Sequence, residues 1–408
     1  MDWSTVNPQA AGMNAAQLER VGAHLESRYL APGKISGCLT AVLRRGHLAY
    51  LHVAGERDRE RGLPVSTDTL FRIYSMTKPV TSLALMMLWE RGLFSLDDPV
   101  HRFIPEFRDL RVRVGGAWPE FITEAAARPM RVRDLLRHTS GLTYHFMYAT
   151  NIDHAYRELG VGMPAPGYTL DAMLDQLAGL PLEFSPGDRW NYSVATDVLG
   201  ALIERLSGQT LPEFFSEHIF EPLGMTETVF SPRPDQLERF ASCYTRDAGK
   251  RLVLEDDAQA SQFRDRTFFS GGGGLLSTAG DYLRFCRMLL AGGSLDGERL
   301  LGPRTLDFMV ANHLPEGADI AGLSMSGFSE THNEGVGFGL GFACKTNAVR
   351  NGYPASEGSY YWGGLASTLF WVDPAEDLIV LFLTQLIPSS TFNFRGQLEA
   401  LIYAAINR

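Results

Sequence analysis

Hydrophobic positions change their spacing along the chain, and extended segments lie toward its two ends. Residues 37–43 and 48–54 are short apolar runs separated by Arg45-Gly46, which is the pattern of a β-hairpin. Extended character returns after Val336, where further apolar runs are separated by turn residues. We therefore expect strands near both termini. The C-terminal ones are predicted over 337–344, 366–372 and 378–384.

Between these ends the apolar residues follow the spacing of α-helices. From about residue 79 to residue 287, periodic segments alternate with long loops. One apolar stripe spans 198–206, and Gly208 is placed to end that helix. The remaining helix signals are a cap at Asn14 before a helix that stops at Pro32, a cap at Thr278, and an amphipathic stretch over 392–406.

This distribution predicts an α+β chain with two structural units. A length of 408 residues is a prior for two to three domains. Strands at both ends around a helical middle indicate one sheet assembled from both termini. We expect residues 1–79 plus 275–408 to form the sheet unit, residues 80–274 to form a mostly helical unit, and the active site to lie between them.

Composition and charge narrow the class of protein. The chain is 45% hydrophobic and 21% charged, which is typical of a globular protein. A net charge of −10, with no run of basic residues, argues against a nucleic-acid partner. The N-terminus does not read as a secretory signal, and the most apolar stretch, 378–387, is about half a membrane span. We therefore expect a cytoplasmic protein without a membrane span.

The cysteines and histidines give no sign of a metal site or other cofactor. Four cysteines are scattered along the chain without C-x-x-C spacing. There is no H-E-x-x-H, so neither zinc nor another cofactor is expected. Reduced, buried thiols in a cytosolic protein are the simplest interpretation of Cys38, Cys243, Cys286 and Cys344.

The first candidate for chemistry is Ser75-Met76-Thr77-Lys78. It opens a predicted helix, so side chains three residues apart share one face and the Ser75 hydroxyl can meet the Lys78 amine. The spacing alone is weak and also fits an ordinary surface lysine. The presence of a lysine at this position favours the catalytic interpretation, because the chain holds only four lysines among 37 basic residues. A buried lysine can lose its proton near neutral pH, whereas an arginine cannot.

Two further segments are candidates. Tyr192 lies at the junction between the loop of 184–188 and a predicted helix, a position that can hold a phenol in a cleft beside Lys78. Taken singly, such a tyrosine is more often a packed core residue. In Trp362-Gly363-Gly364-Leu365, the two glycines allow the backbone to approach a ligand closely. That segment also fits a simple glycine bend in a sheet.

Together these segments resemble the serine β-lactamase and penicillin-binding-protein superfamily, and most of all its class C β-lactamase-like esterases, the family VIII carboxylesterases. The resemblance spans nearly the whole chain. It implies an antiparallel sheet flanked by helices, with an inserted helical unit. The other segments that carry it are Thr69-Leu70-Phe71-Arg72, the turn of 93–100, the run of 132–142 with its His-Thr-Ser-Gly, and Glu221-Pro222-Leu223-Gly224-Met225.

The resemblance implies a role for each motif residue. Ser75 would be the nucleophile, with Lys78 and Tyr192 as the general-base pair. The backbone N–H groups of Ser75 and Leu365 would form the oxyanion hole. Trp362, Gly363 and Gly364 would contact the substrate.

Two positions depart from the β-lactamase pattern. Val194 stands where those enzymes carry the Asn of Y-x-N, and Trp362-Gly363-Gly364 replaces K-T-G. Both changes match the esterases and argue against an efficient β-lactamase. Lys345-Thr346-Asn347 looks like a degraded K-T-G, but its place at the end of a predicted strand favours a turn.

Other catalytic signatures are weaker. No serine has the G-x-S-x-G spacing of an α/β-hydrolase. The glycines of 335–341 lack the G-x-G-x-x-G spacing, and Ser270 to Gly274 lacks the Lys-Ser/Thr of a phosphate loop, so a role for the latter in shaping the pocket is the better interpretation. His138 with Ser140 is interpreted as structural.

We therefore predict a serine hydrolase that cleaves small-molecule carboxylic esters of short to medium acyl length through an acyl-serine. The alternatives are a β-lactamase, D-amino peptidase or amidase on the same triad, an acyltransferase to an acceptor other than water, and a catalytically silent binding protein. The sequence leaves the oligomeric state open. Aromatic and methionine candidates for the pocket are Phe146, Met147, Tyr148 and Trp362.

Overall fold

The computed structural model describes residues 3–325 and 333–407. Its centre is an eight-stranded sheet in which all neighbouring strands are antiparallel. In spatial order the strands are β12 (Val336–Phe338), β13 (Ala343–Lys345), β14 (Tyr360–Gly363), β15 (Leu369–Asp373), β16 (Leu378–Thr384), β1 (Gly37–Arg44), β2 (His47–Asp58) and β3 (Leu63–Pro64).

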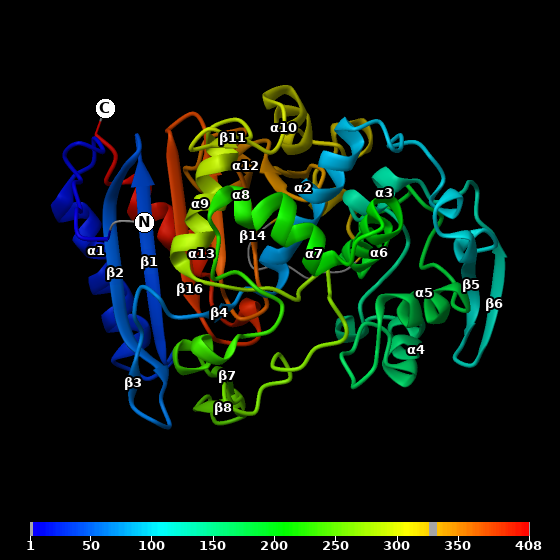
Figure 1. Cartoon of the computed structure of the whole chain (residues 1–408), viewed down its shortest axis with the longest axis horizontal. Helices are drawn as coiled ribbons and strands as arrows, with labels where there is room; N and C mark the ends of the chain where they lie inside the picture. The colour runs from blue at the N-terminus through cyan, green and yellow to red at the C-terminus, as the bar shows by residue number, and fades with distance from the viewer. Residues whose placement is uncertain (1–2, 326–332, 408) are drawn as a thin grey trace.

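The sheet joins the two ends of the chain, as the sequence predicts. The first strand, β1, pairs with the last, β16, from Cys38 opposite Thr384 to Arg44 opposite Leu378. Every residue of both strands is buried, because helices cover both faces of the sheet. In Figure 1 the blue N-terminal strands therefore lie beside the red C-terminal ones.

Helices from the two ends of the chain cover one face, and a third helix covers the other. On one face, α1 (Ala15–Leu25) packs beside α13 (Phe394–Tyr403), whose Phe394 ring lies 4.9 Å from that of Phe382 on β16. On the opposite face, Tyr282 of α9 (Ala279–Leu290) packs 5.2 Å from Phe370 of β15. The sheet thus forms the middle layer of three (Figure 1).

The middle of the chain is mostly helical, but it also contains strand pairs that the sequence did not predict. The hairpin of β5 (Arg111–Ala117) and β6 (Glu120–Ala125) lies at the edge farthest from the sheet in Figure 1. The pair of β7 (Cys243–Arg246) and β8 (Leu252–Asp256) also lies in this middle part. Two further pairs lie outside it: β4 (Phe71–Arg72), which falls in a segment that the sequence indicates as extended, pairs with β9 (Leu276–Ser277), and β10 (Ser294–Leu295) pairs with β11 (Glu298–Arg299).

The predicted caps are confirmed. The Asn14 side chain accepts from the Gln17 N–H at the start of α1, and Thr278 does the same for Asp281 in α9. Gly208 ends α6 (Ala195–Ser207) in the left-handed conformation. The remaining helices are α2 (Thr77–Glu90), α3 (Val132–Leu136), α4 (Asn151–Leu159), α5 (Leu170–Ala178), α7 (Leu211–Phe215), α8 (Glu221–Leu223), α10 (Pro303–Val310), α11 (Ile320–Leu323) and α12 (Ala348–Asn351).

One predicted strand is wrong. The run 337–344 is not a single strand but the two strands β12 and β13, joined by a turn over 339–342. Glycines make that turn possible. A Cβ on Gly339 would lie 2.2 Å from the Met309 carbonyl oxygen, and one on Gly341 would lie 2.2 Å from Ser82 Oγ.

All four cysteines are free and buried, in line with the prediction of reduced thiols. No helix within residues 3–325 and 333–407 is long and apolar enough to cross a membrane. No group of three or more potential metal ligands occurs in the same ranges.

Candidate active site

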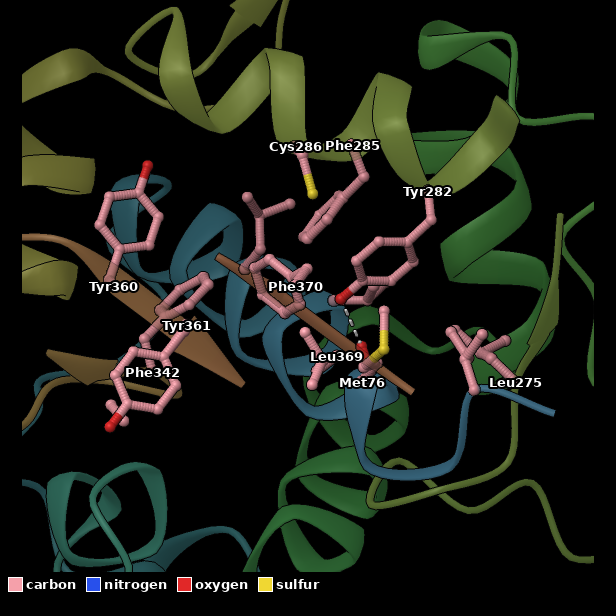
Figure 2. Packing of buried hydrophobic residues seen from close by; sticks show 14 of the residues in the cluster. Met76, Leu275, Tyr282, Phe285, Cys286, Phe342, Tyr360, Tyr361, Leu369 and Phe370 are labelled. Atoms are coloured by element: carbon pink, nitrogen blue, oxygen red, sulfur yellow. Dashed lines mark hydrogen bonds between the residues drawn. The ribbon is translucent and has the colours of Figure 1, made fainter. Parts of the chain in front are cut away.

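Ser75 lies in a single turn of 3-10 helix, Tyr74–Met76, that runs directly into α2. Its position agrees with the predicted helix start. A buried hydrogen bond of 2.9 Å from the Tyr282 hydroxyl to the Met76 carbonyl ties this turn to α9 (Figure 2). Figure 2 shows Tyr282 and Phe285 of α9 packed over Met76 and the residues of β15. The turn that carries Ser75 therefore rests on a rigid apolar core.

Lys78 lies one turn further along and is 1% exposed. Its Nζ donates three hydrogen bonds, to Ser75 Oγ at 3.2 Å, the Tyr144 hydroxyl at 2.9 Å and the Gly272 carbonyl at 2.7 Å. Burial lowers the pKa of Lys78 to about 7, although the nearby Asp197 carboxylate acts in the opposite direction. Near neutral pH the amine is therefore partly unprotonated and can accept a proton from Ser75.

Tyr192 lies three residues before α6, at the loop–helix junction that the sequence indicates. Its ring centroid is 4.5 Å from Lys78 Nζ, which is the distance of a cation–π contact. The ring packs 5.0 Å from His138 and 5.5 Å from Trp362. Tyr192 thus meets Lys78 through its ring face, whereas the hydroxyl that accepts from Lys78 belongs to Tyr144.

Tyr144 and Asp197 are site residues that the sequence reasoning missed. Asp197, 2% exposed on the first turn of α6, accepts hydrogen bonds from Ser270 Oγ at 2.5 Å and from the Gly272 N–H at 3.0 Å. Burial raises the pKa of Asp197, and the Lys78 ammonium lowers it. Two signals were available: a carboxylate within an apolar helix face, and a tyrosine three residues after the His-Thr-Ser-Gly segment.

Gly272 brings these groups together. A Cβ at this position would lie 2.6 Å from Asp197 Oδ2 and 2.9 Å from the Tyr144 hydroxyl, so only glycine fits. Its carbonyl accepts from Lys78, and its N–H donates to Asp197. Gly272 and Gly273 also line the cavity, as expected for a glycine segment that shapes the pocket.

The second candidate oxyanion donor, Leu365, follows β14. Gly364 packs directly on the turn that precedes Ser75, since a Cβ there would lie 2.3 Å from the Ile73 carbonyl oxygen. The Gly364 N–H donates to the Thr368 carbonyl at 2.7 Å, which closes the loop. Among the described residues, no protein acceptor takes the N–H of Ser75 or of Leu365, and both residues line the cavity.

These residues surround one cavity of about 230 Å³. Trp362, Gly363, Gly364 and Phe146 line it, in agreement with the sequence. Of the two other pocket candidates, Met147 packs against the hydrophobic core, and Tyr148 is 76% exposed and stacks with Arg157 at 4.2 Å. Aromatic rings form much of the wall, including those of Trp190, Phe268 and Tyr361.

The two sequence decoys have structural explanations. His138 is buried between aromatic rings, which lowers its pKa well below the usual value, and its Nδ1 lies 3.3 Å from Ser193 Oγ. Lys345 ends β13 and forms a buried ion pair of 2.7 Å with Glu399 on α13. Asn347 then caps α12. Lys345 is therefore a structural residue rather than a substrate cation.

Comparison with known proteins places the chain among serine enzymes of this fold. Esterase EstB of Burkholderia gladioli is 34% identical over 404 residues, which cover 94% of each chain. An uncharacterized protein of Mycobacterium tuberculosis is 38% identical over 359 residues, 87% of each chain. The structure of EstCE1, described as a hydrolase with promiscuous acyltransferase activity, superimposes with a TM-score of 0.77 at 28% identity, covering 98% of this chain and 99% of the other.

The family described as beta-lactamase matches residues 23–404, nearly the whole chain. This match and the esterase relatives agree with the fold and its antiparallel sheet. The chain belongs to the beta-lactamase family, in the part of it that contains EstB-like esterases.

Proposed function

We propose that this protein hydrolyses carboxylic esters of short to medium acyl length through an acyl-serine formed on Ser75. The observation that carries the proposal is the contact of 3.2 Å between Ser75 Oγ and Lys78 Nζ. Because burial lowers the pKa of Lys78 to about 7, the amine can act as a base at neutral pH. EstB and EstCE1 support the same reaction class.

In the first step, Ser75 Oγ attacks the ester carbonyl carbon and its proton passes to Lys78. The N–H groups of Ser75 and Leu365 would receive the developing oxyanion, because no described acceptor uses them. The tetrahedral intermediate then collapses, the C–O bond to the alcohol breaks, and the Lys78/Tyr192 pair returns the proton to the leaving oxygen. In the second step water attacks the acyl-serine carbonyl carbon and gives its proton to the same pair. The C–O bond to Ser75 then breaks, the carboxylic acid leaves, and the proton returns to Ser75 Oγ.

Tyr144 has a place in this proposal beside Tyr192. Burial raises the pKa of the Tyr144 hydroxyl well above its usual value, so the phenol stays protonated. A protonated phenol that accepts from Lys78 at 2.9 Å fixes the direction of the amine. We therefore propose Tyr144 as a positioning residue for Lys78.

β-Lactam hydrolysis is the weaker alternative, and the same holds for peptidase or amidase activity on this triad. Trp362 and two glycines stand where a K-T-G motif would offer a cation to the β-lactam carboxylate. The substitute cation, Lys345, is taken up by Glu399. Side-by-side rates on p-nitrophenyl butyrate and a chromogenic cephalosporin separate these activities, and we expect the ester to be strongly preferred.

Acyl transfer is the second candidate, because EstCE1 combines it with hydrolysis. An alcohol that replaced water in the second step would give a new ester from the same acyl-serine. Adding a primary alcohol during hydrolysis and measuring the new ester tests for this reaction. If the alcohol leaves the product unchanged, the enzyme acts on water alone.

The test of the proposal is a set of single substitutions assayed on a panel of p-nitrophenyl esters of increasing acyl length. Groups that act as one unit lose activity together, so S75A, K78A and Y192F should each lower kcat by at least about 1,000-fold. A fluorophosphonate probe should label the wild type and not S75A. Wild-type turnover by S75A, or no labelling of the folded wild type, would favour a catalytically silent binding protein instead.

We also propose that the binding partner is a small-molecule ester. In this proposal the active site lies at the boundary between the sheet unit (1–79 plus 275–408) and the helical unit (80–274). A cytoplasmic location fits the four free thiols.

A further inference from the structure

Arg266 lines the same cavity as Ser75. Its backbone N–H donates to Ser231 Oγ at 3.4 Å, but its guanidinium has no hydrogen-bond or ion-pair partner within the described part of the chain. Its Nε is inaccessible to solvent and has no acceptor. Its guanidinium stacks on the buried ring of Phe263, with 3.4 Å from Cζ to the ring centroid. A hydrogen-bonding group at this wall of the cavity is thus left unsatisfied by the protein.

Arg72 and Arg44, which are more deeply buried than Arg266, have their partners within the protein. Arg72, which is 0% exposed, pairs with Asp256 at 2.8 Å and donates to Ser261 at 3.1 Å. Arg44 pairs with Glu376 and also donates to backbone carbonyls. Burying a cation without such partners is costly, so an unpartnered one inside a cavity points to a ligand that completes it.

The charged groups around Arg266 do not neutralise it. The nearby groups that affect it are Tyr74, Arg72, Asp256 and Asp197. Asp256 is already bound by Arg72, and Asp197 accepts from Ser270 and Gly272. Burial lowers the pKa of Arg266 to about 10, which still leaves the guanidinium charged at neutral pH.

Arg266 is also linked to the nucleophile by direct packing. Phe263 contacts the Arg266 guanidinium on one side, and on another it packs edge-on against Tyr74 with 5.7 Å between ring centroids. Tyr74 directly precedes Ser75 in the same turn, and both line the cavity. A group bound at Arg266 would therefore share the cavity with an ester at Ser75.

We infer that Arg266 forms a carboxylate subsite, and that the preferred substrates are esters carrying a free carboxylate group. The inference rests on the proposed esterase function and adds a substrate class to it. A planar guanidinium fork pairs two N–H groups with the two oxygens of a carboxylate. The other arginine that lines the cavity, Arg395, donates to the Phe370 and Trp362 carbonyls. The Arg266 guanidinium therefore suits a monoanion, because a phosphate dianion would require more positive charge.

The test compares two matched pairs of esters on purified protein. Monomethyl glutarate and methyl pentanoate differ by a carboxylate on the acyl side, and 4-acetoxybenzoate and phenyl acetate differ by one on the alcohol side. The loss of a charge-assisted hydrogen bond predicts that R266M lowers kcat/KM for one acidic ester by about tenfold or more, with a change below about twofold for its neutral partner. R266K should retain part of the preference, since it keeps the charge but not the fork.

Two controls separate binding from folding. R264M removes an exposed arginine of the same loop, whose guanidinium bonds to the Gln259 carbonyl, and should leave all four rates unchanged. Thermal melting should show R266M at least as stable as the wild type, because an unpaired buried cation is removed.

The outcomes are distinct. The carboxylate subsite is overturned if R266M keeps the wild-type ratio of kcat/KM between the acidic and the neutral ester in both pairs. It is also overturned if the wild type hydrolyses the neutral esters but neither acidic one. Either result leaves the esterase function intact. No hydrolysis of any ester by the wild type contradicts the proposed function itself.

Discussion

Lys78 carries opposing influences that set its protonation. Burial disfavours the ammonium and brings the pKa to about 7, whereas the Asp197 carboxylate favours the ammonium. The same carboxylate is held in place by Ser270 Oγ and the Gly272 N–H. Asp197 therefore tunes the pH at which the proposed base becomes available.

This balance predicts a pH dependence. In the wild type, kcat/KM on a neutral ester should rise with pH through about 7, as Lys78 loses its proton. D197N keeps an oxygen for Ser270 and Gly272 but removes the charge that raises the pKa of Lys78. The rising limb should therefore move to lower pH. A full pH profile of both proteins checks this, and a limb that stays in place or moves to higher pH would contradict it.

Substitution of the two tyrosines beside Lys78 should have different effects on kcat. Y144F removes the acceptor at 2.9 Å from Lys78 Nζ, so the amine loses its alignment while its ring contact with Tyr192 remains. We expect kcat to fall by about 10- to 100-fold with KM nearly unchanged, as for the loss of one buried hydrogen bond to a charged group. Steady-state kinetics on one ester measures both values. A Y144F enzyme with wild-type kcat would remove Tyr144 from the proposal.

At the scale of elements, close backbone approach assembles the site. β4 pairs with β9 and so holds the Ser75 turn beside the glycine segment that ends at Gly274. The loop after β14 is held from the other side, because Arg395 of α13 donates to the Trp362 carbonyl at 3.0 Å. Elements from three distant parts of the chain thus meet at one cavity.

A substitution at Gly364 tests whether close backbone contact at the site is required for activity. G364A would place a Cβ 2.3 Å from the Ile73 carbonyl oxygen and push the Leu365 N–H away from Ser75. We expect a kcat loss of about 100-fold, as for removal of one oxyanion donor, and a stability loss of about 1–3 kcal/mol. The matched control is G280A within α9, where the nearest atom is 3.8 Å away and alanine should stabilise the helix slightly. Equal kinetics in the two variants would contradict the assignment.

Local sequence signals predicted much of the fold. The strand over 378–384 and the cap at Thr278 are correct, because periodicity and capping are properties of neighbouring residues. The sequence did not predict the β5–β6 hairpin. It also predicted β12 and β13 as one strand, because the turn between them is defined by tertiary contacts such as the close approach of Gly341 to Ser82. Tyr144 and Asp197 were missed for a related reason: burial beside Lys78 gives them their roles, and no local spacing encodes it.

At the scale of the whole molecule, the last helix ties the end of the chain to the sheet. Lys345 of β13 and Glu399 of α13 form an ion pair from which solvent is almost excluded. Burial lowers the pKa of Lys345, and Glu399 raises it. Neither of these described residues lines the cavity. The pair therefore contributes to stability and not to the reaction.

A double-mutant cycle checks this separation. E399L leaves Lys345 buried without a partner and should lower the free energy of unfolding by about 3–5 kcal/mol. K345M/E399L should recover most of that loss, since two apolar side chains replace the pair. Denaturant unfolding gives both values. Ester hydrolysis by the folded double variant should match the wild type, and a selective loss of activity would restore Lys345 as a substrate cation.

The pairing of β1 with β16 also determines when the sheet can fold during synthesis of the chain. About 330 residues separate Arg44 from Leu378, so β1 can pair with β16 only after this long intervening segment has been synthesised. The two termini lie together, because Asn14 N–H donates to the Ala405 carbonyl and Met13 bridges to Ile406. A circular permutant that joins them and opens between β5 and β6 shortens this separation to about 75 residues. Its sheet would form from contiguous chain and should refold faster than the natural order, as stopped-flow fluorescence would show.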